Sequence, residues 1–314
     1  MITRDLYLKV LGNVRRCIIG RDETFSLIFS AILAGGHVLL EDNPGTGKTT
    51  LAKCIAKSIN GDMGRIQFTP DLMPQDITGI NVYSRKDEEF HLLKGPIFTN
   101  ILLADEINRA TPRTQSSLLE SMEERTCTID RETLSLPSPF LVIATENPLE
   151  TTGTYPIPEA QLDRFLIKMS MDNLNKEDEI TILETYKSAN PMEEIQPVCS
   201  CEDILNAINE VKNIYVHKCI EEYIVDIAIA TRNSNKLLVG ISPRASIALM
   251  RVSQAFAAIS GRNYVIPDDV RFLAPYVLGH RIITASGIQT MLECNTVIND
   301  IVKGIIVPTE NWAE

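Results

Sequence analysis

The sequence EDNPGTGKTT, residues 41–50, lies between an apolar run and a segment with helical spacing. The run VLLE (38–41) predicts a strand, and KTTLAKCIAKSI (48–59) predicts a helix. Two glycines followed by Lys-Thr at such a junction are typical of a loop that wraps phosphate oxygens. The usual pattern has a glycine where this chain has Asp42, whose carboxylate we expect to point outwards. A glycine-bearing turn without a ligand is the alternative, and the flanking strand and helix make it the less favoured one.

Most residues of this loop have a predicted role in binding ATP. Gly45 and Gly47 allow backbone N–H groups to approach phosphate oxygens, and the helix N-terminus adds its positive dipole end. Lys48 can reach the β- and γ-phosphates, while the Thr49 hydroxyl can bind Mg²⁺. The predicted ATP-binding residues of the loop are therefore Asn43, Pro44, Gly45, Thr46, Gly47, Lys48, Thr49 and Thr50.

A second apolar run, ILLADE (101–106), ends in two acids. A buried strand would place Asp105 in the Mg²⁺ shell and let Glu106 orient and deprotonate the attacking water. Such a run on its own is common and also fits a strand that ends in solvated acids. Its position after a phosphate-binding loop favours the catalytic interpretation.

Five apolar runs between residues 37 and 170 predict the strands of one sheet. These runs are HVLLE (37–41), RIQFT (65–69), ILLADE (101–106), FLVIATE (140–146) and FLIKMS (165–170). Strands with so few polar interruptions are typical of a parallel sheet that helices cover on both faces. Helical spacing in KTTLAKCIAKSI and PRTQSSLLESMEE (112–124) supports this α/β architecture. Alternating residues around polar turns predict two inserted hairpins, at 77–93 and 126–136.

The strand signal fades after about residue 173, and helical spacing takes over. We therefore predict an α/β nucleotide-binding domain over residues 1–172 and a small α-helical domain over 173–314. The predicted helices of the second domain are 176–188, 200–212, 217–232, 243–260 and 267–278.

Composition limits the class of protein. The chain has 314 residues and a net charge of −11, so a chain-wide basic surface for nucleic acid is missing. Its N-terminus is polar, and the charge-free run 24–40 predicts a buried helix, a glycine turn and a strand rather than a membrane span. Seven scattered cysteines fit a cytoplasmic protein. The spacing of Cys199, Cys201, His217 and Cys219 favours free thiols over a zinc site.

With these motifs in place, the chain resembles a MoxR-type AAA+ ATPase of the helix-2-insert group from about residue 18 to 310. The resemblance is carried by long stretches in both predicted domains. They are RIQFTPDLMPQDITG (65–79), GPIFTNILLADEINRATPRTQSSLLESMEER (95–125), FLVIATENP (140–148), TYPIPEAQLDRF (154–165), GISPRA (240–245) and VIPDDVRFLAPYVLGHR (265–281). Ile77 to Leu93 resembles the insert within helix 2, and Thr126 to Leu136 the hairpin before sensor 1. The family usually has glycine in the second turn, where this chain has Asp130-Arg131-Glu132.

The resemblance implies a hexameric ring that holds ATP and Mg²⁺ between neighbouring subunits. Asn147 matches the sensor-1 residue, which contacts the lytic water or the γ-phosphate. Arg164 matches the arginine finger delivered from a neighbour, and Arg244 matches the sensor-2 arginine, acting in cis or from the neighbouring lid. Ile18, Ile19 and Gly20 resemble the stretch that packs on adenine, although Arg21 stands where the family usually has glutamine.

Each of these roles has a structural alternative. Asn147 could cap the turn that follows its strand. Arg164 could form a surface ion pair with Asp163 or Glu159, and Arg244 could pair at a helix N-terminus. The hairpins could be surface decorations.

The family assignment implies an ATP hydrolase that remodels or matures partner proteins, including von Willebrand factor A-domain proteins. Two alternatives stay open. A nucleic-acid motor is disfavoured by the acidic total and by hairpins that lack interleaved basic and aromatic residues. A nucleotide-switched scaffold with slow turnover is compatible with the same site residues.

Overall fold

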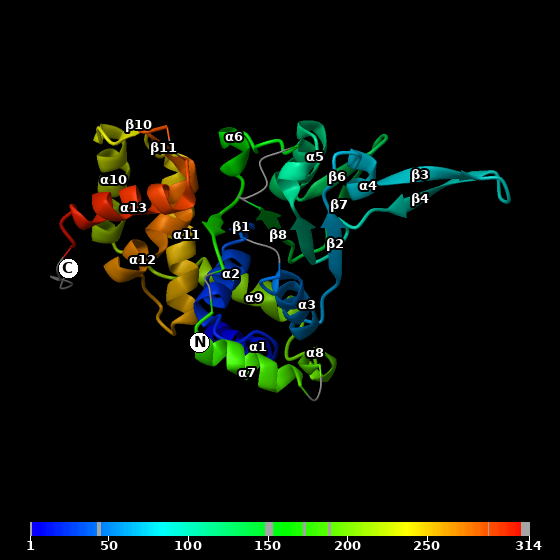
Figure 1. Ribbon diagram of the computed structural model, residues 1–314, viewed down its shortest axis with the longest axis horizontal. Helices are drawn as coiled ribbons and strands as arrows, with labels where there is room; N and C mark the ends of the chain where they lie inside the picture. Colours follow the sequence, from blue (N-terminus) through cyan, green and yellow to red (C-terminus); the bar gives the residue numbers. More distant parts are fainter. Residues whose placement is uncertain are drawn as a thin grey trace.

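Five short apolar strands form the central sheet of the computed structural model (Figure 1). The structure describes residues 2–42, 45–147, 153–171, 174–187, 190–287 and 289–308. All neighbouring strands are parallel and follow the order β2-β5-β8-β1-β9, which confirms the predicted parallel α/β sheet. The strands are β1 (Val38–Glu41), β2 (Met63–Gln67), β5 (Ile101–Asp105), β8 (Leu141–Glu146) and β9 (Ile167–Met169).

Alternate strand residues face two separate hydrophobic cores, because successive side chains of a strand point to opposite faces. On one face, residues such as Leu40 and Leu103 pack with helices α1 (Ile2–Cys17), α2 (Asp22–Leu33) and α3 (Lys48–Ser58). Leu39 and Leu102 lie on the other face with α5 (Pro112–Glu124). Burial on both faces explains why the inner strands β1, β5 and β8 are almost wholly apolar. The edge strand β2 is only partly buried and carries Arg65 and Gln67.

The charge-free run 24–40 folds as the sequence predicts. Helix α2 ends at Leu33, Gly35 takes a φ of +70° in the turn, and β1 begins at Val38. No helix in the described part of the chain is long and apolar enough to cross a membrane.

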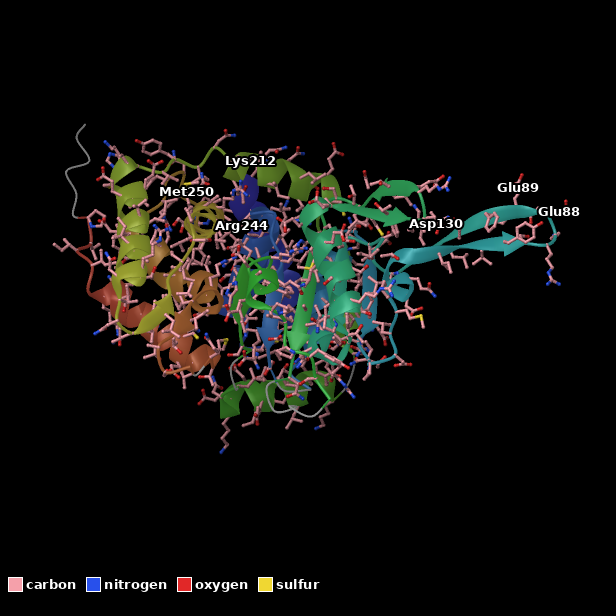
Figure 2. All side chains as sticks on the ribbon, turned by 90° about the horizontal axis from the view of Figure 1, so that it is seen from above. Glu88, Glu89, Asp130, Lys212, Arg244 and Met250 are labelled. Atoms are coloured by element: carbon pink, nitrogen blue, oxygen red, sulfur yellow. The ribbon has the colours of Figure 1, made fainter. Side chains whose placement is uncertain are left out.

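Both predicted hairpins are present. The first, β3 (Gly79–Ser84) with β4 (Glu89–Lys94), follows the short helix α4 (Pro74–Thr78). It projects from the body with Glu88 and Glu89 at its far end (Figure 2). The second is β6 (Thr126–Ile129) with β7 (Glu132–Ser135).

The turn of the second hairpin explains how the chain does without the usual glycine. Asp130 itself takes the left-handed conformation, with a φ of 53°, which aspartate tolerates better than most residues. Its Oδ2 accepts a hydrogen bond of 2.8 Å from Asn81 Nδ2, and this bond links the two hairpins.

Helices dominate the rest of the described chain. They are α7 (Lys176–Tyr186), α8 (Pro191–Glu194), α9 (Cys201–Val211), α10 (Lys218–Asn233), α11 (Pro243–Ile259), α12 (Pro267–Leu278) and α13 (Met291–Lys303). Five of them, α7 and α9 to α12, lie at the predicted positions. Short elements complete the described fold: α6 (Glu159–Leu162), the 3₁₀ turns Ile107–Arg109 and Gly279–Arg281, and the antiparallel pair β10 (Leu237–Val239) and β11 (Ile283–Thr284).

The sequence analysis missed the short helix α8, the helix α13 and the β10–β11 pair. The buried residues Cys294, Ile298 and Val302 of α13 are four apart, so a helical signal was present. The two strands have three and two residues, too few to show a periodic pattern.

The predicted domain boundary at 172/173 falls on residues outside the described ranges, so the division stays a prediction. Helix α9, assigned by sequence to the second domain, contributes Ile204 and Ala207 to the core that also contains Leu6 of α1. The described helices on this side of the sheet therefore share one continuous core.

A buried histidine connects the start of β1 to the neighbouring strand β8 and to the helix α5. The Val142 N–H of β8 donates to His37 Nδ1 at 2.9 Å, so Nε2 carries the proton and donates to the Met122 carbonyl of α5 at 3.1 Å. Burial, and then the positive charge of Arg125, lower the pKa of His37 from 6.5 to about 3. The imidazole is therefore neutral in the folded protein at neutral pH.

We expect the replacement His37→Gln to flatten the acid dependence of stability. Between pH 6.5 and about 3 the unfolded chain binds a proton that folded His37 does not. The free energy of unfolding therefore decreases as the pH is lowered, by about 1.4 kcal/mol per pH unit from this residue alone. Denaturant unfolding at pH 7, 5.5 and 4 measures the slope, which should be shallower in the variant even if its stability at pH 7 is lower. Equal slopes in both proteins would contradict this role.

Candidate nucleotide-binding site

A cavity of about 340 Å³ lies where β1, β5 and β8 end. Because these strands are parallel, their carboxyl ends meet at one edge of the sheet, where ligands of open α/β sheets bind. The cavity brings together nine residues that the sequence assigns to the site: Gly45, Thr46, Gly47, Lys48, Thr49, Thr50, Asp105, Glu106 and Asn147. The other two predicted loop residues, Asn43 and Pro44, lie outside the described residues.

The backbone of the loop explains where it needs glycine. Gly45 and Gly47 have φ values of +89° and +93°, a region that disfavours side chains, and Gly47 immediately precedes α3. Asp42 is not among the described residues with positive φ, so its position does not require glycine.

Asp42 anchors the loop through its backbone. Its N–H donates to the Glu146 carbonyl of β8 at 3.0 Å, and its own carbonyl accepts from Lys48 Nζ at 3.2 Å. The predicted outward carboxylate is wrong, because Asp42 lines the cavity and its Oδ2 is buried. This oxygen is excluded from solvent because the backbone bond to β8 holds residue 42 against the sheet edge.

Two polar residues of β2 reach the two acids. Arg65 Nε donates to Asp105 Oδ2 at 2.8 Å, and Gln67 Nε2 donates to Glu106 Oε2 at 2.8 Å. Arg65 and Gln67 are two residues apart, so both side chains leave the same face of β2. Sequence reasoning missed them, although polar residues alternating within RIQFT were a visible signal.

Glu106 is held in an unusual backbone conformation. Its φ and ψ are 56° and 51°, a left-handed geometry that costs a non-glycine residue roughly 1–3 kcal/mol. Two contacts stabilise it: the Glu106 N–H donates to Thr145 Oγ1 of β8 at 2.8 Å, and Arg109 Nη1 donates to Glu106 Oε2 at 2.8 Å. The position of the candidate base therefore depends on a neighbouring strand and on the turn that follows it.

The donor set suits Mg²⁺. Thr49 and Asp105 both present oxygen to the same cavity, and Mg²⁺ prefers oxygen ligands, commonly one or two protein groups together with substrate phosphates. Asp105 is buried, and its charge is compensated in this structure by Arg65. A metal at Asp105 would therefore compete with a guanidinium for the same carboxylate.

An ion-pair network supports the end of the sheet beside Asn147. Glu41 and Glu146 are register partners on β1 and β8, and Lys168 of β9 lies 2.7 Å and 3.5 Å from their carboxylates. Burial lowers the pKa of Lys168, but the two carboxylates raise it by more, so the net pKa is raised and the ammonium stays charged. Burial raises the pKa of Glu146, and Lys168 opposes that shift. Lys168 thus keeps two adjacent acids together next to the phosphate loop and Asn147.

Arg164 and Arg244 lie together, but away from the phosphate cavity of their own chain. Arg164 Nε lies 3.2 Å from Glu123 Oε2, and Arg244 Nη2 donates to Glu123 Oε1 at 2.8 Å. Arg244 Nε also lies 3.5 Å from Asp163. Arg164 thus pairs with Glu123 in the described structure rather than with Asp163 or Glu159, because α5 brings Glu123 to it.

The two arginines line a cavity of about 260 Å³ with Gly36 and His37, just before β1, and with Leu166, just before β9. Since all five strands are parallel, this is the amino edge of the sheet. The phosphate cavity lies at the carboxyl edge. Arg281 Nε, 2.5 Å from Asp163 Oδ1, helps to fix the acid that also contacts Arg244.

The stretch 18–20 borders the phosphate loop. Ile18 Cδ1 lies 3.6 Å from the position that a Cβ on Gly47 would take. Gly20 has a φ of +71°, and a Cβ there would lie 2.3 Å from Asp178 Oδ2 of α7. Ile19 is half-buried between them. The predicted adenine contact of Ile19 and Gly20 stays a prediction, and Ile18 is the residue nearest the loop.

The cysteine–histidine group divides into two sets of local contacts. Cys199 and Cys201 donate to the carbonyls of Ser58 and Ile59, each at 3.6 Å. His217 Nδ1 lies 3.0 Å from Cys219 Sγ at the start of α10. Among the described residues, no group of three or more His, Cys, Asp or Glu side chains is arranged to hold a metal ion.

Known proteins resemble both parts of the chain. Residues 37–167 match the family described as "ATPase family associated with various cellular activities (AAA)", and residues 229–301 match the AAA lid domain. A crystal structure from Cytophaga hutchinsonii, described as a candidate ATPase, superimposes with a TM-score of 0.89. It is 37% identical and covers 98% of this chain and 96% of its own.

Relatives that match most of the chain support the same family. The protein YeaC of Bacillus subtilis is 45% identical over 97% of this chain and 96% of its own length. Chaperone MoxR1 of Mycobacterium tuberculosis is 39% identical over 96% of this chain and 82% of its own. Protein MoxR of Methylorubrum extorquens is 28% identical over 89% of this chain and 88% of its own.

We expect Arg65→Gln to lower the Mg²⁺ concentration needed for tight nucleotide binding by several-fold. The variant removes the cation that competes with the metal for Asp105, while glutamine keeps a hydrogen-bond donor. A Mg²⁺ titration of fluorescent ADP binding measures the effect without relying on turnover. Lys236→Gln, which breaks an exposed ion pair with Asp300 on the lid, is the matched control and should match the parent. A higher Mg²⁺ requirement in Arg65→Gln would show that Arg65 supports the metal site instead.

Proposed function

This chain belongs to the MoxR family of AAA ATPases, and we propose that it hydrolyses ATP between the subunits of a ring in order to remodel partner proteins. The observation that carries the proposal is the separation of two sets of residues. The phosphate loop, Asp105 and Glu106 lie at the carboxyl edge of the sheet, whereas Arg164 and Arg244 lie at its amino edge.

The separation is too large for the arginines to serve their own site. A four-residue strand such as β1 spans roughly 13 Å, and the arginines are held by Glu123 and Asp163 at its far end. A head-to-tail contact between copies places one surface of a subunit against a different surface of the next, and such contacts close into rings. This arrangement supports a hexamer-like ring in which Arg164 and Arg244 both act on the neighbour's ATP.

The chemistry then divides between two subunits. In one, the loop backbone and Lys48 bind the phosphates, Glu106 orients and deprotonates the attacking water, and Asn147 contacts that water or the γ-phosphate. Thr49 and Asp105 would hold Mg²⁺, which neutralises phosphate charge. From the other, Arg164 and Arg244 stabilise charge that develops on the transferred phosphoryl group.

The described fold leaves space between this site and the C-terminal helices, so a change at the site can be followed by a movement of the helices. A cavity of about 640 Å³ separates the sheet edge from α13 and is lined by Asn147 and Lys168 on one side and by Met291 and Cys294 on the other. Space between the two parts allows the helices to move as ATP is bound and hydrolysed.

Protein clients fit the hairpin better than nucleic acid does. Tyr83 and Phe90 form an exposed cross-strand pair with ring centroids 5.2 Å apart, and Phe90 is 70% exposed. The tip carries Asp87, Glu88 and Glu89 against Arg85 and Lys86, so it does not attract phosphates. The relative named Chaperone MoxR1 supports a chaperone-like role. Von Willebrand factor A-domain proteins are the partner class that we propose, because the family resemblance implies them.

A slow, nucleotide-switched scaffold is the second candidate. Arg65 engages Asp105, while Gln67 and Arg109 engage Glu106, so both acids are occupied in the isolated chain. This pairing favours low turnover until a neighbour or client rearranges the site.

All seven cysteines are free, which supports a cytoplasmic place of action.

We expect specific ATPase activity to rise with protein concentration and to fall roughly a thousandfold in Arg164→Ala, since an arginine finger contributes that much. Lys48→Ala, which keeps Arg164, should be inactive by itself. Mixing the two inactive variants should restore activity, because about a quarter of the contacts then pair an intact loop with an intact arginine. Concentration-independent activity that survives Arg164→Ala would rule out a shared site.

Glu106→Gln should trap ATP. Glutamine preserves the shape of the side chain but cannot accept the proton of water, so hydrolysis should fall by at least about a hundredfold while binding persists. Nucleotide that stays bound through gel filtration, identified as ATP or ADP, provides the readout. Lys48→Ala should instead lose the bound nucleotide. Normal hydrolysis by Glu106→Gln would show that another group is the base.

A further inference from the structure

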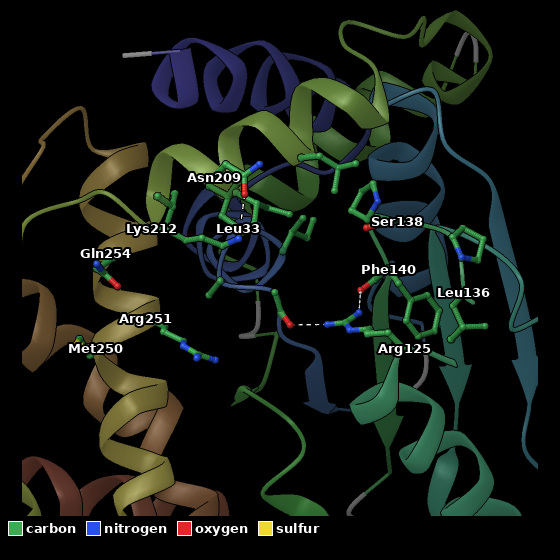
Figure 3. Close-up of a pocket in the computed structure, with 18 residues that line it drawn as sticks. Leu33, Arg125, Leu136, Ser138, Phe140, Asn209, Lys212, Met250, Arg251 and Gln254 are labelled. Atoms are coloured by element: carbon green, nitrogen blue, oxygen red, sulfur yellow. Dashed lines mark hydrogen bonds between the residues drawn. The ribbon is translucent and has the colours of Figure 1, made fainter. Parts of the chain in front are cut away.

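A second large cavity, of about 820 Å³, lies outside the phosphate site (Figure 3). It is bordered by the end of α2, by residues 136–140 after the second hairpin, and by α9 and α11. None of the proposed steps of ATP hydrolysis uses it.

The lining of this cavity is apolar and positively charged. Leu33, Leu136 and Phe140 contribute apolar surface, and the cations are Arg125, Lys212 and Arg251. None of the described residues that line it is an aspartate or a glutamate, although the chain as a whole has a net charge of −11. We call it the basic–apolar pocket.

The three cations line the cavity, and no carboxylate among the described lining residues neutralises them. Arg125 donates to the carbonyls of Phe140 and Gly35, and its guanidinium lies 5.6 Å from the centre of the Phe140 ring. Within the described residues, Lys212 Nζ donates to a neutral amide, Asn209 Oδ1, at 3.0 Å and forms no ion pair. Figure 3 shows Lys212 and Arg251 reaching from α9 and α11 toward the space that Arg125 bounds on the other side. A ligand that combines apolar side chains with carboxylates would complement this surface.

Helix α7 of the same chain combines exposed apolar side chains with a net negative charge. It buries none of its residues, and Ile180 and Leu183, three apart on one side of the helix, are 45% and 72% exposed. The exposed charges around them are Glu177, Glu179 and Glu184 together with Lys176 and Lys187, and with the half-buried Asp178 the segment 176–187 has a net charge of −2.

Two contacts hold α7 beside the nucleotide end of its own chain. The Asp178 carboxylate lies where a side chain on Gly20 would be, and Tyr186 Oη donates to the Cys17 carbonyl at 3.2 Å. These contacts leave the side that carries Leu183 exposed. The side of α7 that carries Ile180 and Leu183 is therefore available to another molecule, on a helix whose net charge is opposite to that of the pocket.

We propose that α7 of one subunit docks in the basic–apolar pocket of its neighbour. The docking rests on the proposed ring and identifies a second contact within the same interface. The pocket shares Gly35, Arg125 and Arg251 with the cavity that holds Arg164 and Arg244. Helix α7, in turn, adjoins Gly20, next to the stretch that borders the phosphate loop. An interface that brings the two arginines to a neighbour's ATP thus also brings the pocket toward that neighbour's α7.

Two substitutions on opposite sides of the contact test the docking. Leu183→Ser removes the most exposed apolar side chain of α7, and Arg251→Glu reverses a charge in the pocket. Subunit association with Mg²⁺ and ATPγS, measured by analytical ultracentrifugation, should weaken at least about tenfold in each, since burying one leucine contributes about that much. Leu292→Ser (Leu292 is 79% exposed) and Lys218→Glu (side chain 82% exposed) are the matched controls and should associate as the parent does.

A cysteine pair tests the geometry directly. A chain that carries both Leu183→Cys and Lys212→Cys should form disulfide-linked dimers and larger ladders under mild oxidation with ATPγS, whereas each single variant should not. If association is unchanged in Leu183→Ser and Arg251→Glu and the pair does not cross-link, the docking is wrong. The ring is judged separately by the Arg164→Ala and Lys48→Ala mixture, which can still regain activity in that case. A parent chain that never associates would overturn both.

Discussion

The parallel alignment of β1, β5 and β8 is the constraint on which the rest of the candidate site depends. It places Glu41, Asp105 and Glu146 at one edge of the sheet, and the loop before α3 continues from the same edge. Such a concentration of acids would repel itself in a buried position. Lys168 from β9 and Arg65 from β2, the two outer strands, supply the compensating charges. The edge strands therefore complete the electrostatics of a site whose reactive groups lie on the inner ones.

The same alignment gives the molecule two chemically different edges. The carboxyl edge presents a glycine-bearing loop and a helix N-terminus suited to anions. The amino edge presents Arg164 and Arg244 around Glu123 and Asp163. A single chain cannot bring these edges together across its own sheet, but two chains in head-to-tail contact can. In the proposed docking, the basic–apolar pocket lies on the arginine side and the helix α7, with its net negative charge, on the nucleotide side.

Much of the fold and the centre of the site could be predicted from sequence. Buried strands and amphipathic helices produce a periodic pattern of apolar residues over short stretches of sequence. The five strands, both hairpins and the predicted C-terminal helices are therefore found where this pattern predicts them. The phosphate loop was predictable for a related reason. Its glycines, Lys48 and Thr49 are contiguous, and their conformations are set by local backbone geometry.

What only the tertiary structure decided are contacts between residues far apart in the chain. The pairing of Arg65 with Asp105, the support of Glu106 by Thr145 and the meeting of Arg164 with Arg244 at Glu123 link separate elements. No sequence period reports such contacts, because they depend on strand order and helix packing rather than on spacing. The sequence by itself determined the loop, the strands and the candidate site residues at their ends. The packing of those strands decided which partner holds each one, and it placed the arginines at the opposite edge of the sheet from the phosphate-binding loop.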